Sequence, residues 1–257
     1  MLKLVQIVAA IGLAVMLFGG GFEPATAQSG PLRLLVSNGM KGSLEALQLQ
    51  AEKAVGRPLS IEFNSTASLR KKIAAGEAFD ATVITVEAVD ELIAQGVLTA
   101  ASRTDVGQSE LGIGIRAGAP RPDVRTPESL KQTLLAAKSI TYPQDGASRG
   151  YIEQMFQRLG IASEVKPKVI LAQGSGPATE SVAKGQAAMV LTLFSEILPV
   201  EGVEVLGPFP GDYHFDIKFA AAASAKSQNA AAVKTFIAFL TSPTAAPVLK
   251  AKGIAPK

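Results

Sequence analysis

The feature that most constrains this chain is a regular alternation of short β-branched runs with segments of helical hydrophobic period, from Pro31 almost to Lys257. Short apolar runs bounded by turn residues are typical of buried strands, and amphipathic stretches that end at glycine are typical of helices. Strands that alternate with helices favour a mostly parallel sheet with helices on both faces. We therefore expect an α/β fold over the whole of this region.

The alternation predicts eight strands and eight helices. Strands are expected at residues 32–37, 59–63, 81–85, 111–116, 139–142, 168–171, 188–193 and 215–223. Helices are expected at residues 43–55, 67–75, 86–94, 128–137, 149–159, 178–184, 229–240 and 243–252. A loop with three prolines is expected at residues 118–127, and a turn-rich stretch at 207–211 precedes the last strand.

The N-terminus carries the signature of an export signal. Lys3 gives a positive start, residues 4–18 are apolar, and glycines at 19–21 break any helix. Ala25-Thr26-Ala27 has the small-x-small pattern that signal peptidase reads, so cleavage is expected after Ala27. The apolar run is shorter than the roughly 20 residues that a spanning helix needs. A signal peptide at residues 1–27 is therefore preferred over a retained membrane anchor.

Composition excludes several classes of protein. The chain has no cysteine, which rules out disulfides, thiolate metal sites, a catalytic cysteine and a lipid-modified N-terminal cysteine. An exported chain without a lipid anchor is expected in the periplasm of a Gram-negative bacterium. The net charge is only +3 and the basic residues form no block, so nucleic-acid binding is not expected. No nucleophile elbow, phosphate-binding loop or His-rich metal spacing is present, so we expect no metal and no cofactor.

Polar and small residues gather where strands give way to helices. Four junctions share this composition, at residues 37–43, 64–68, 145–150 and 173–177. In an open α/β sheet such loops lie at the carboxyl ends of the strands, where ligands bind. Helix starts offer free N–H groups and partial positive charge, hydroxyls add donors, and glycine allows close approach of an anion. The junctions predict an anion site, although ordinary caps and turns have the same composition.

Several segments resemble periplasmic solute-binding proteins of the molybdate-binding type. The similar stretches are residues 63–69, 73–76, 79–81, 146–160, 236–243 and 245–246. The resemblance implies a periplasmic-binding-protein fold in which two α/β domains, joined by a two-strand hinge, close on a ligand and deliver it to an ABC permease. We expect domain I at residues 28–112 plus 213–257 and domain II at residues 113–212. A monomer is expected.

The resemblance also implies which residues hold the ligand. In this family hydroxyls and backbone N–H groups hold the oxyanion. The matching positions here, with their neighbours and two cations in the same loops, form the predicted ligand-binding set Ser37, Asn38, Met40, Lys41, Ser65, Thr66, Ser148, Arg149, Ser175 and Leu193. Met40 and Leu193 stand where the family has hydroxyl donors. Because Arg grips carboxylates through paired hydrogen bonds, a small organic acid is preferred over a molybdate-like oxyanion.

A second resemblance keeps an enzyme open as the alternative. Residues 105–109 and 116–123 are similar to periplasmic aconitate isomerases built on the same scaffold. Such an enzyme needs a base within reach of an allylic proton of a tricarboxylate. Glu180 and His214 are the two side chains considered for that role, and a lone histidine is more often structural. The sequence assigns no catalytic residue, and a binding protein is preferred over an enzyme.

Overall fold

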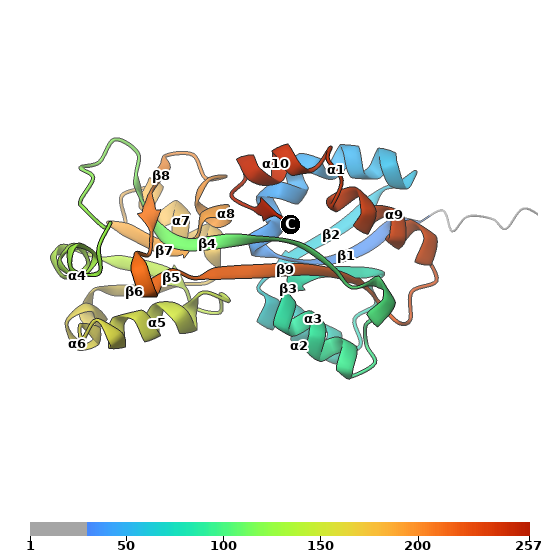
Figure 1. Cartoon of the computed structure of the whole chain (residues 1–257), viewed down its shortest axis with the longest axis horizontal. Helices are drawn as coiled ribbons and strands as arrows, with labels where there is room; N and C mark the ends of the chain where they lie inside the picture. Colours follow the sequence, from blue (N-terminus) through green and yellow to red (C-terminus); the bar gives the residue numbers. More distant parts are fainter. Residues whose placement is uncertain (1–29) are drawn as a thin grey trace, which may run out of the picture.

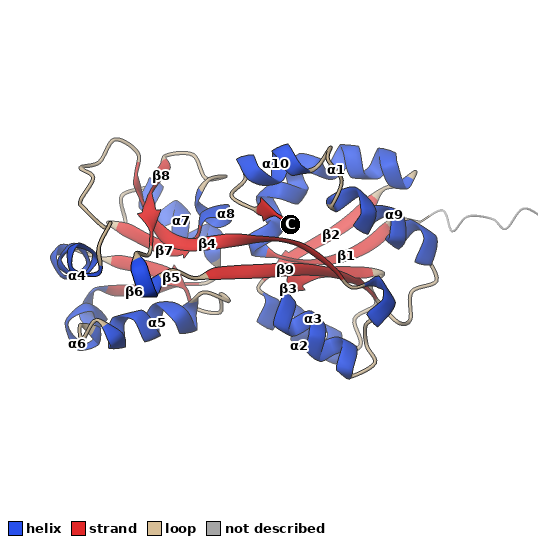
Figure 2. Cartoon of the chain, viewed as in Figure 1, coloured by secondary structure: helices blue, strands red, loops and turns tan. Residues whose placement is uncertain are grey.

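A computed structural model describes residues 30–257. The predicted signal peptide at residues 1–27 lies outside the described residues. The described chain forms two lobes side by side, which two long strands connect (Figure 1). Helices cover both faces of the sheet in each lobe (Figure 2). The α/β class predicted from the alternation and the two-domain periplasmic-binding-protein fold implied by the resemblance are confirmed.

All eight predicted strands and all eight predicted helices are present. The strands are β1 (Leu32–Ser37), β2 (Leu59–Asn64), β3 (Ala81–Thr85), β4 (Thr104–Arg116), β5 (Ile140–Pro143), β6 (Val169–Ala172), β7 (Met189–Leu193), β8 (Val203–Pro208), β9 (Asp216–Ala223) and β10 (Ala255–Pro256). The α-helices are α1 (Lys41–Val55), α2 (Thr66–Ala74), α3 (Val86–Ala94), α4 (Pro127–Ala136), α5 (Arg149–Arg158), α6 (Ala162–Val165), α7 (Ser175–Ala183), α8 (Phe194–Ile197), α9 (Ala230–Leu240) and α10 (Ala246–Ala251). Four short 3₁₀ helices are η1 (Asn38–Met40), η2 (Ala100–Ser102), η3 (Lys166–Lys168) and η4 (Gly211–Tyr213). By contrast, β8, β10, α6 and α8 were not predicted.

The sheet is mixed, with a parallel group of strands in each lobe. β1 pairs in parallel with β2 and β3 in the first lobe, and β5 pairs in parallel with β6 and β7 in the second. The strand order is β2-β1-β3-β9-β4-β7-β5-β6, with β8 and β10 also paired to β4. The strands that join the lobes are antiparallel to their neighbours. The parallel groups place strand-to-helix junctions from both lobes along one edge.

β4 is the strand that passes from one lobe to the other. Its residues 104–110 pair with β9, and residues 111–116 pair with β7 and β8. The sequence prediction included only the second part of this strand. It also missed β8, because Gly207 and Pro208 were interpreted as turn residues, although both pair with β4. The predicted domain boundaries at residues 112 and 213 fall close to the two crossings and stay a prediction.

Close packing at the end of β1 fixes the first junction. Gly39 follows β1, and a Cβ atom at this position would lie 2.5 Å from the ring of Phe219. Phe219 is itself buried in the core that β1, α1 and β9 share. Only glycine fits between the turn and this ring, so the backbone of residues 38–40 lies directly on the sheet.

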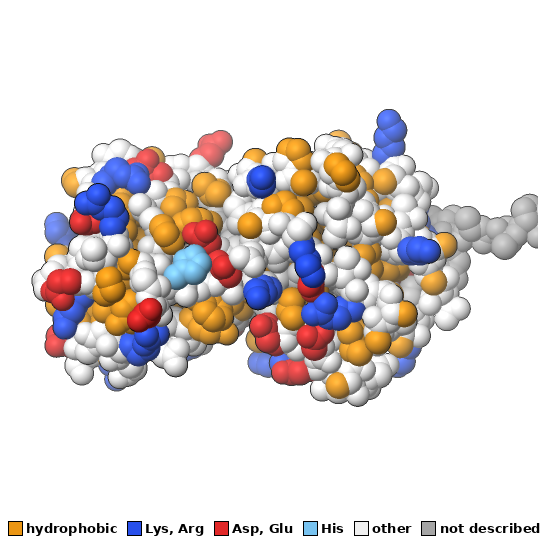
Figure 3. Space-filling view, in the orientation of Figure 1, with side chains coloured by type: hydrophobic (Ala, Val, Ile, Leu, Met, Phe, Trp, Pro, Cys, Tyr) orange, Lys and Arg blue, Asp and Glu red, His pale blue; other side chains and the backbone are white. Residues whose placement is uncertain are grey.

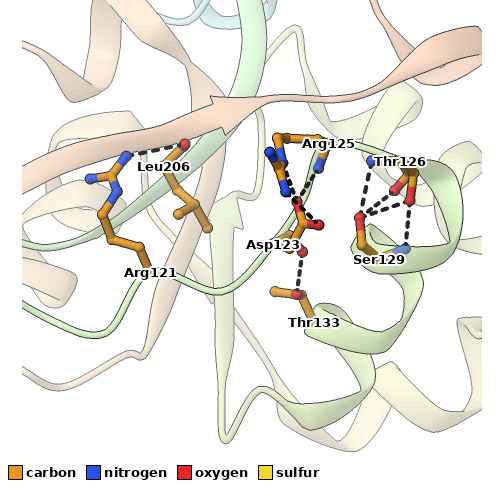
Figure 4. Close-up of polar contacts among 7 residues, drawn as sticks. All are labelled: Arg121, Asp123, Arg125, Thr126, Ser129, Thr133 and Leu206. Atoms are coloured by element: carbon orange, nitrogen blue, oxygen red, sulfur yellow. Dashed lines mark hydrogen bonds and ion pairs between the residues drawn. The ribbon is translucent and has the colours of Figure 1, made fainter.

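The proline-containing loop ends in a well-defined helix start (Figure 4). Thr126 Oγ1 accepts a hydrogen bond from Ser129 N at 3.1 Å, and Ser129 Oγ accepts one from Thr126 N at 3.0 Å. This reciprocal capping, with Pro127 in the first turn, begins α4 one residue before its predicted start. Arg121 anchors the same loop to β8 through the carbonyl of Leu206.

The surface of the described chain carries mixed charge. On the face shown in Figure 3, Lys and Arg side chains are interspersed with Asp and Glu. Clusters of one sign are needed for a nucleic-acid interface, so this face does not fit one. Among the helices of residues 30–257, none combines the length and the hydropathy that a membrane crossing requires.

Candidate functional site

A small cavity lies between the lobes, where junctions from both parallel strand groups meet. Its lining residues are Ser37, Asn38, Ser65, Thr66, Pro143, Asp145, Gly146, Ala147, Ser148, Ser175, Leu193 and Glu196. The space measures about 10 Å³, which is room for about one water molecule. The wall combines hydroxyl groups, the first turns of helices and two carboxyl groups. It is therefore a nearly closed polar site that both lobes build.

The first lobe contributes the N-terminus of α2. Ser65 is the N-cap, and its hydroxyl accepts a hydrogen bond from Ser68 N at 3.1 Å. Thr66, the first residue of the helix, is 8% exposed, and its Oγ1 has no hydrogen-bond partner among the described residues. A buried hydroxyl without a partner costs about 1–3 kcal/mol, so the group calls for a partner such as a water molecule or a ligand atom.

The second lobe contributes two further helix starts. Ser148, which precedes α5, is 1% exposed, and its Oγ has no partner within the described chain. Ser175 begins α7 after Gly174, whose φ of 96° is open to glycine and strained for other residues. Thr66 and Ser148 thus present free hydroxyls from opposite lobes, each beside a helix N-terminus.

Asp145 bridges the lobes across the cavity. Its Oδ2 accepts hydrogen bonds from Ser65 Oγ at 2.7 Å and from Ser68 Oγ at 3.4 Å. Both hydroxyls belong to the first turn of α2 or its cap, whereas Asp145 lies in the loop after β5. The carboxylate therefore places a negative group where the positive end of α2 attracts one.

Glu196 is the second carboxyl group of the site. Thr192 donates a hydrogen bond to it through its hydroxyl. Burial raises the pKa of Glu196 above its ordinary value of 4.5, and Asp145 adds to the rise, although the hydroxyls of Thr192 and Ser175 and the backbone of Leu193 act against it. Glu196 therefore takes up a proton more readily than an ordinary glutamate.

A larger groove adjoins the cavity. It has a volume of about 520 Å³, and both spaces share Asn38, Asp145, Ser175 and Glu196 as lining residues. Lys41 of α1 lines the groove and forms an ion pair with Glu45, with 3.8 Å between Nζ and Oε1. A ligand with one end in the cavity has room for its remainder here, close to a cation.

The structure brings together seven of the ten predicted ligand residues. Those that line the cavity are Ser37, Asn38, Ser65, Thr66, Ser148, Ser175 and Leu193. Lys41 lines the groove instead. Met40 is 0% exposed and packs in the hydrophobic core, because the turn after β1 directs it inward, so it lines neither space.

Arg149 lies away from the cavity. Its Nε donates to Glu153 Oε1 at 2.8 Å, and its Nη1 donates to the carbonyl of Gln144 at 2.8 Å. The side chain follows its own helix, where Glu153 one turn later holds the guanidinium. Arg149 lines a separate groove beside Tyr142. This placement gives no support to Arg149 as a clamp for a carboxylate.

The two side chains considered as bases differ in position. Glu180 lines the groove, and a hydrogen bond from Lys184 lowers the pKa of its carboxyl, which makes it a weak base. His214 lies at the second crossing, exposed, with its Nε2 3.5 Å from Asp216 Oδ2. It lines neither the cavity nor the groove, and the single histidine is visible on the outer face in Figure 3.

Asp145 and Glu196 are the functional candidates that the predicted set omits. Asp145 belongs to a junction that the sequence singled out, but it is not among the predicted ligand residues. Glu196 follows β7 by three residues, in a junction that contains no glycine. Thr192, Ser195 and Glu196, at the end of the buried strand β7 and just after it, were the available signal. No group of three His, Cys, Asp or Glu residues suited to a metal occurs in residues 30–257.

Comparison of the chain with known proteins identifies its family. The family model described as bacterial extracellular solute-binding protein matches residues 32–255, almost the whole described chain. The chain belongs to this family. The resemblance to molybdate-type binding proteins that the sequence predicted is confirmed.

Individual relatives of this solute-binding protein fall into two groups. An aconitate isomerase from a Pseudomonas species is 29% identical over 231 residues, covering 88% of this chain and 87% of the relative. The molybdate-binding protein ModA of Escherichia coli is 23% identical over 236 residues, covering 89% and 90%. The solved periplasmic molybdate-binding protein of Azotobacter vinelandii is 20% identical with a TM-score of 0.73, covering 87% of this chain and 98% of that one. The last match shows that the fold is shared.

Proposed function

We propose that this solute-binding protein holds a small organic acid between its lobes, with one carboxylate in the cavity. The observation that carries the proposal is the pair of buried hydroxyls of Thr66 and Ser148, two residues that line the cavity from opposite lobes and whose hydroxyls have no partner in the described chain. Hydroxyls and helix N-termini suit an anion that must be bound and released, because they supply donors without a fixed counter-charge.

The shape of the site favours an organic acid over a bare tetrahedral oxyanion. The cavity continues into a groove of about 520 Å³, which an ion of five atoms leaves empty. Lys41 lines that groove and offers a charge partner for a second carboxylate. Leu193 and Pro143 give the cavity an apolar wall against which carbon atoms pack. A molybdate-like oxyanion is the alternative ligand.

Binding requires the lobes to move, because the cavity has room for about one water molecule. The two crossings, within β4 and between β8 and β9, are the natural place for that motion. A ligand that contacts Thr66 and Ser148 at once favours the closed arrangement, since only there are both contacts made. The lobes of the ligand-free protein are therefore expected to open and close.

Export and delivery complete the proposal. The N-terminal pattern supports cleavage after Ala27 and release of the mature chain into the periplasm. There the closed complex would pass its ligand to an ABC permease. Mass spectrometry of the protein purified from the periplasm tests the first step, and a mature chain that retains residues 1–27 would contradict it.

Calorimetric titration tests the ligand class. The purified mature chain is titrated with trans-aconitate, cis-aconitate and citrate, and separately with molybdate and sulfate. We expect at least one of the three acids to bind more tightly than either oxyanion. Tight molybdate binding without response to any acid would contradict the preference for a carboxylate.

A second function, isomerisation of a tricarboxylate, is favoured by Glu196. Its raised pKa suits a group that both accepts and returns a proton. In an allylic shift the base removes a proton from the methylene carbon beside a carboxylate, and the double bond moves by one carbon. A proton then returns to the former alkene carbon, so no oxidant or further reactant is needed. Asp145 lines the same cavity.

Incubation with cis-aconitate decides whether the chain is such an enzyme. Conversion to the trans isomer is followed by proton NMR in wild type and in Glu196→Gln. Turnover that the substitution reduces at least 100-fold supports Glu196 as the base. Absence of conversion by wild type at high protein concentration would leave the chain a binding protein.

A further inference from the structure

We infer that Glu196 takes up a proton from solvent when an anion enters the cavity, so that the protein binds its ligand together with a proton. The inference rests on the proposed binding function and excludes Glu196 as the base of the isomerase alternative, because a base must be ionised in the complex. It assigns Glu196 a role in binding as the donor of a hydrogen bond to the ligand carboxylate. The proton comes from bulk water or buffer and is returned when the ligand leaves.

The first step of the argument is geometric. Glu196 lines both the cavity and the groove. An anion that bridges the two spaces therefore lies beside the carboxyl group of Glu196. Asp145 is near enough to act electrostatically on Glu196 and lines the same two spaces. An anion here would face two carboxylates, which repel it in a site of reduced polarity.

The second step concerns the cations that are available. The charged side chains that line the cavity or groove with Glu196 are Asp145, Lys41, Glu45 and Glu180. Lys41 pairs with Glu45, and Glu180 pairs with Lys184. In the described chain, β4, β7 and β8 also pack against α8 and add no charged side chain to these spaces. Lys41, which is already paired with Glu45, therefore does not neutralise Asp145, Glu196 and a bound anion together.

The third step is the response of Glu196 to its surroundings. Burial and Asp145 already raise its pKa, and an adjacent ligand anion raises it further, because like charges disfavour the ionised form. Protonation removes one of the three negative charges and turns an acceptor into a donor toward the ligand oxygen. Thr192 Oγ1 can continue to donate to the other oxygen of Glu196. The bound state is thus the more protonated one.

The sign of the pH dependence follows from linkage. If binding takes up a proton, affinity rises as the pH falls from the pKa of Glu196 in the complex to its lower pKa in the free protein. The limit is about tenfold per pH unit when one whole proton is taken up for each ligand bound. Above and below the window between the free and bound pKa values, affinity becomes independent of this group.

The test is calorimetric titration of the mature chain with trans-aconitate and with citrate in two cationic buffers of different ionisation enthalpy. Cationic buffers are chosen because buffer anions would compete for the site. We expect the apparent binding enthalpy to differ between the two buffers, with the sign that corresponds to uptake of a proton by the protein from the buffer. We expect Glu196→Gln to remove that difference. Glu153→Gln, an acid-to-amide change outside the cavity, is the matched control and should keep it.

The outcomes separate this inference from the proposed function. If neither acid binds wild type, the proposed function fails. If an acid binds without proton uptake between pH 5 and pH 8, or if Glu196→Gln retains the uptake, only the role of Glu196 is overturned. The measurement on wild type alone gives the number of protons, so the inference stays testable if the variant does not fold. The number of protons that the ligand itself takes up is obtained from acid–base titration of the free acid. This number is then subtracted from the total measured by calorimetry.

Discussion

Replacing Thr66 by valine should separate stability from binding, because Val has the shape of Thr without the hydroxyl. Thr66 Oγ1 is buried and has no partner in residues 30–257, so its loss removes a cost of about 1–3 kcal/mol in the ligand-free protein. In the complex the same change removes a hydrogen bond to an anion, which contributes about 1.5–3 kcal/mol. The dissociation constant should therefore rise about 10- to 100-fold while the free energy of unfolding stays equal or increases.

Thr82→Val is the matched control for this change. Thr82 is also buried, and its Oγ1 donates to the carbonyl of Leu35 at 2.8 Å, away from the cavity. Its replacement should lower the free energy of unfolding by about 1 kcal/mol and leave affinity unchanged. Urea denaturation and calorimetry with trans-aconitate or citrate measure both quantities. If Thr66→Val destabilises the protein as Thr82→Val does and binds with wild-type affinity, the hydroxyl is structural.

Three further substitutions test other parts of the site. Ser148→Ala should weaken binding at least tenfold without loss of stability, because its buried Oγ also lacks a partner within the described chain, and a stability loss with full affinity would contradict this. Arg149→Ala should change affinity less than twofold, since Glu153 and the Gln144 carbonyl hold the guanidinium outside the cavity, and a tenfold loss would restore it as a ligand contact. Glu196→Gln should raise the melting temperature at pH 8 and lose that advantage near pH 4. At pH 8 the carboxyl of Glu196 is ionised, which its raised pKa shows to be the disfavoured form in the folded protein, whereas near pH 4 it is neutral like the amide of glutamine. An equal difference in melting temperature between variant and wild type at both pH values would refute this.

The sequence predicted the architecture because strand and helix periods are local signals. β1, β3 and α3 have the bounds that their hydrophobic patterns predicted. β8 was missed because Gly207 and Pro208 have turn propensity, and only pairing with β4 makes this segment a strand. Such tertiary pairing has no signature within a short window of residues.

The site was predictable by location and less so by side-chain direction. Four junctions correctly indicated where the lobes meet, since helix starts carry hydroxyl and small residues. Whether Met40 and Arg149 turn toward the cavity depends on core packing and on Glu153, which no junction pattern contains. Glu196 was omitted because it lies outside the four junctions that the sequence singled out. Its role follows only from the burial that the fold imposes.

The central claim is that both lobes hold an anion between Thr66 and Ser148. A crystal structure of the mature chain with the tightest-binding acid from the calorimetric series tests it most directly. The account predicts a carboxylate oxygen within hydrogen-bond distance of Thr66 Oγ1 and of Ser148 Oγ in a single closed complex. A ligand bound in the groove beside Tyr142, or on one lobe alone, would contradict it.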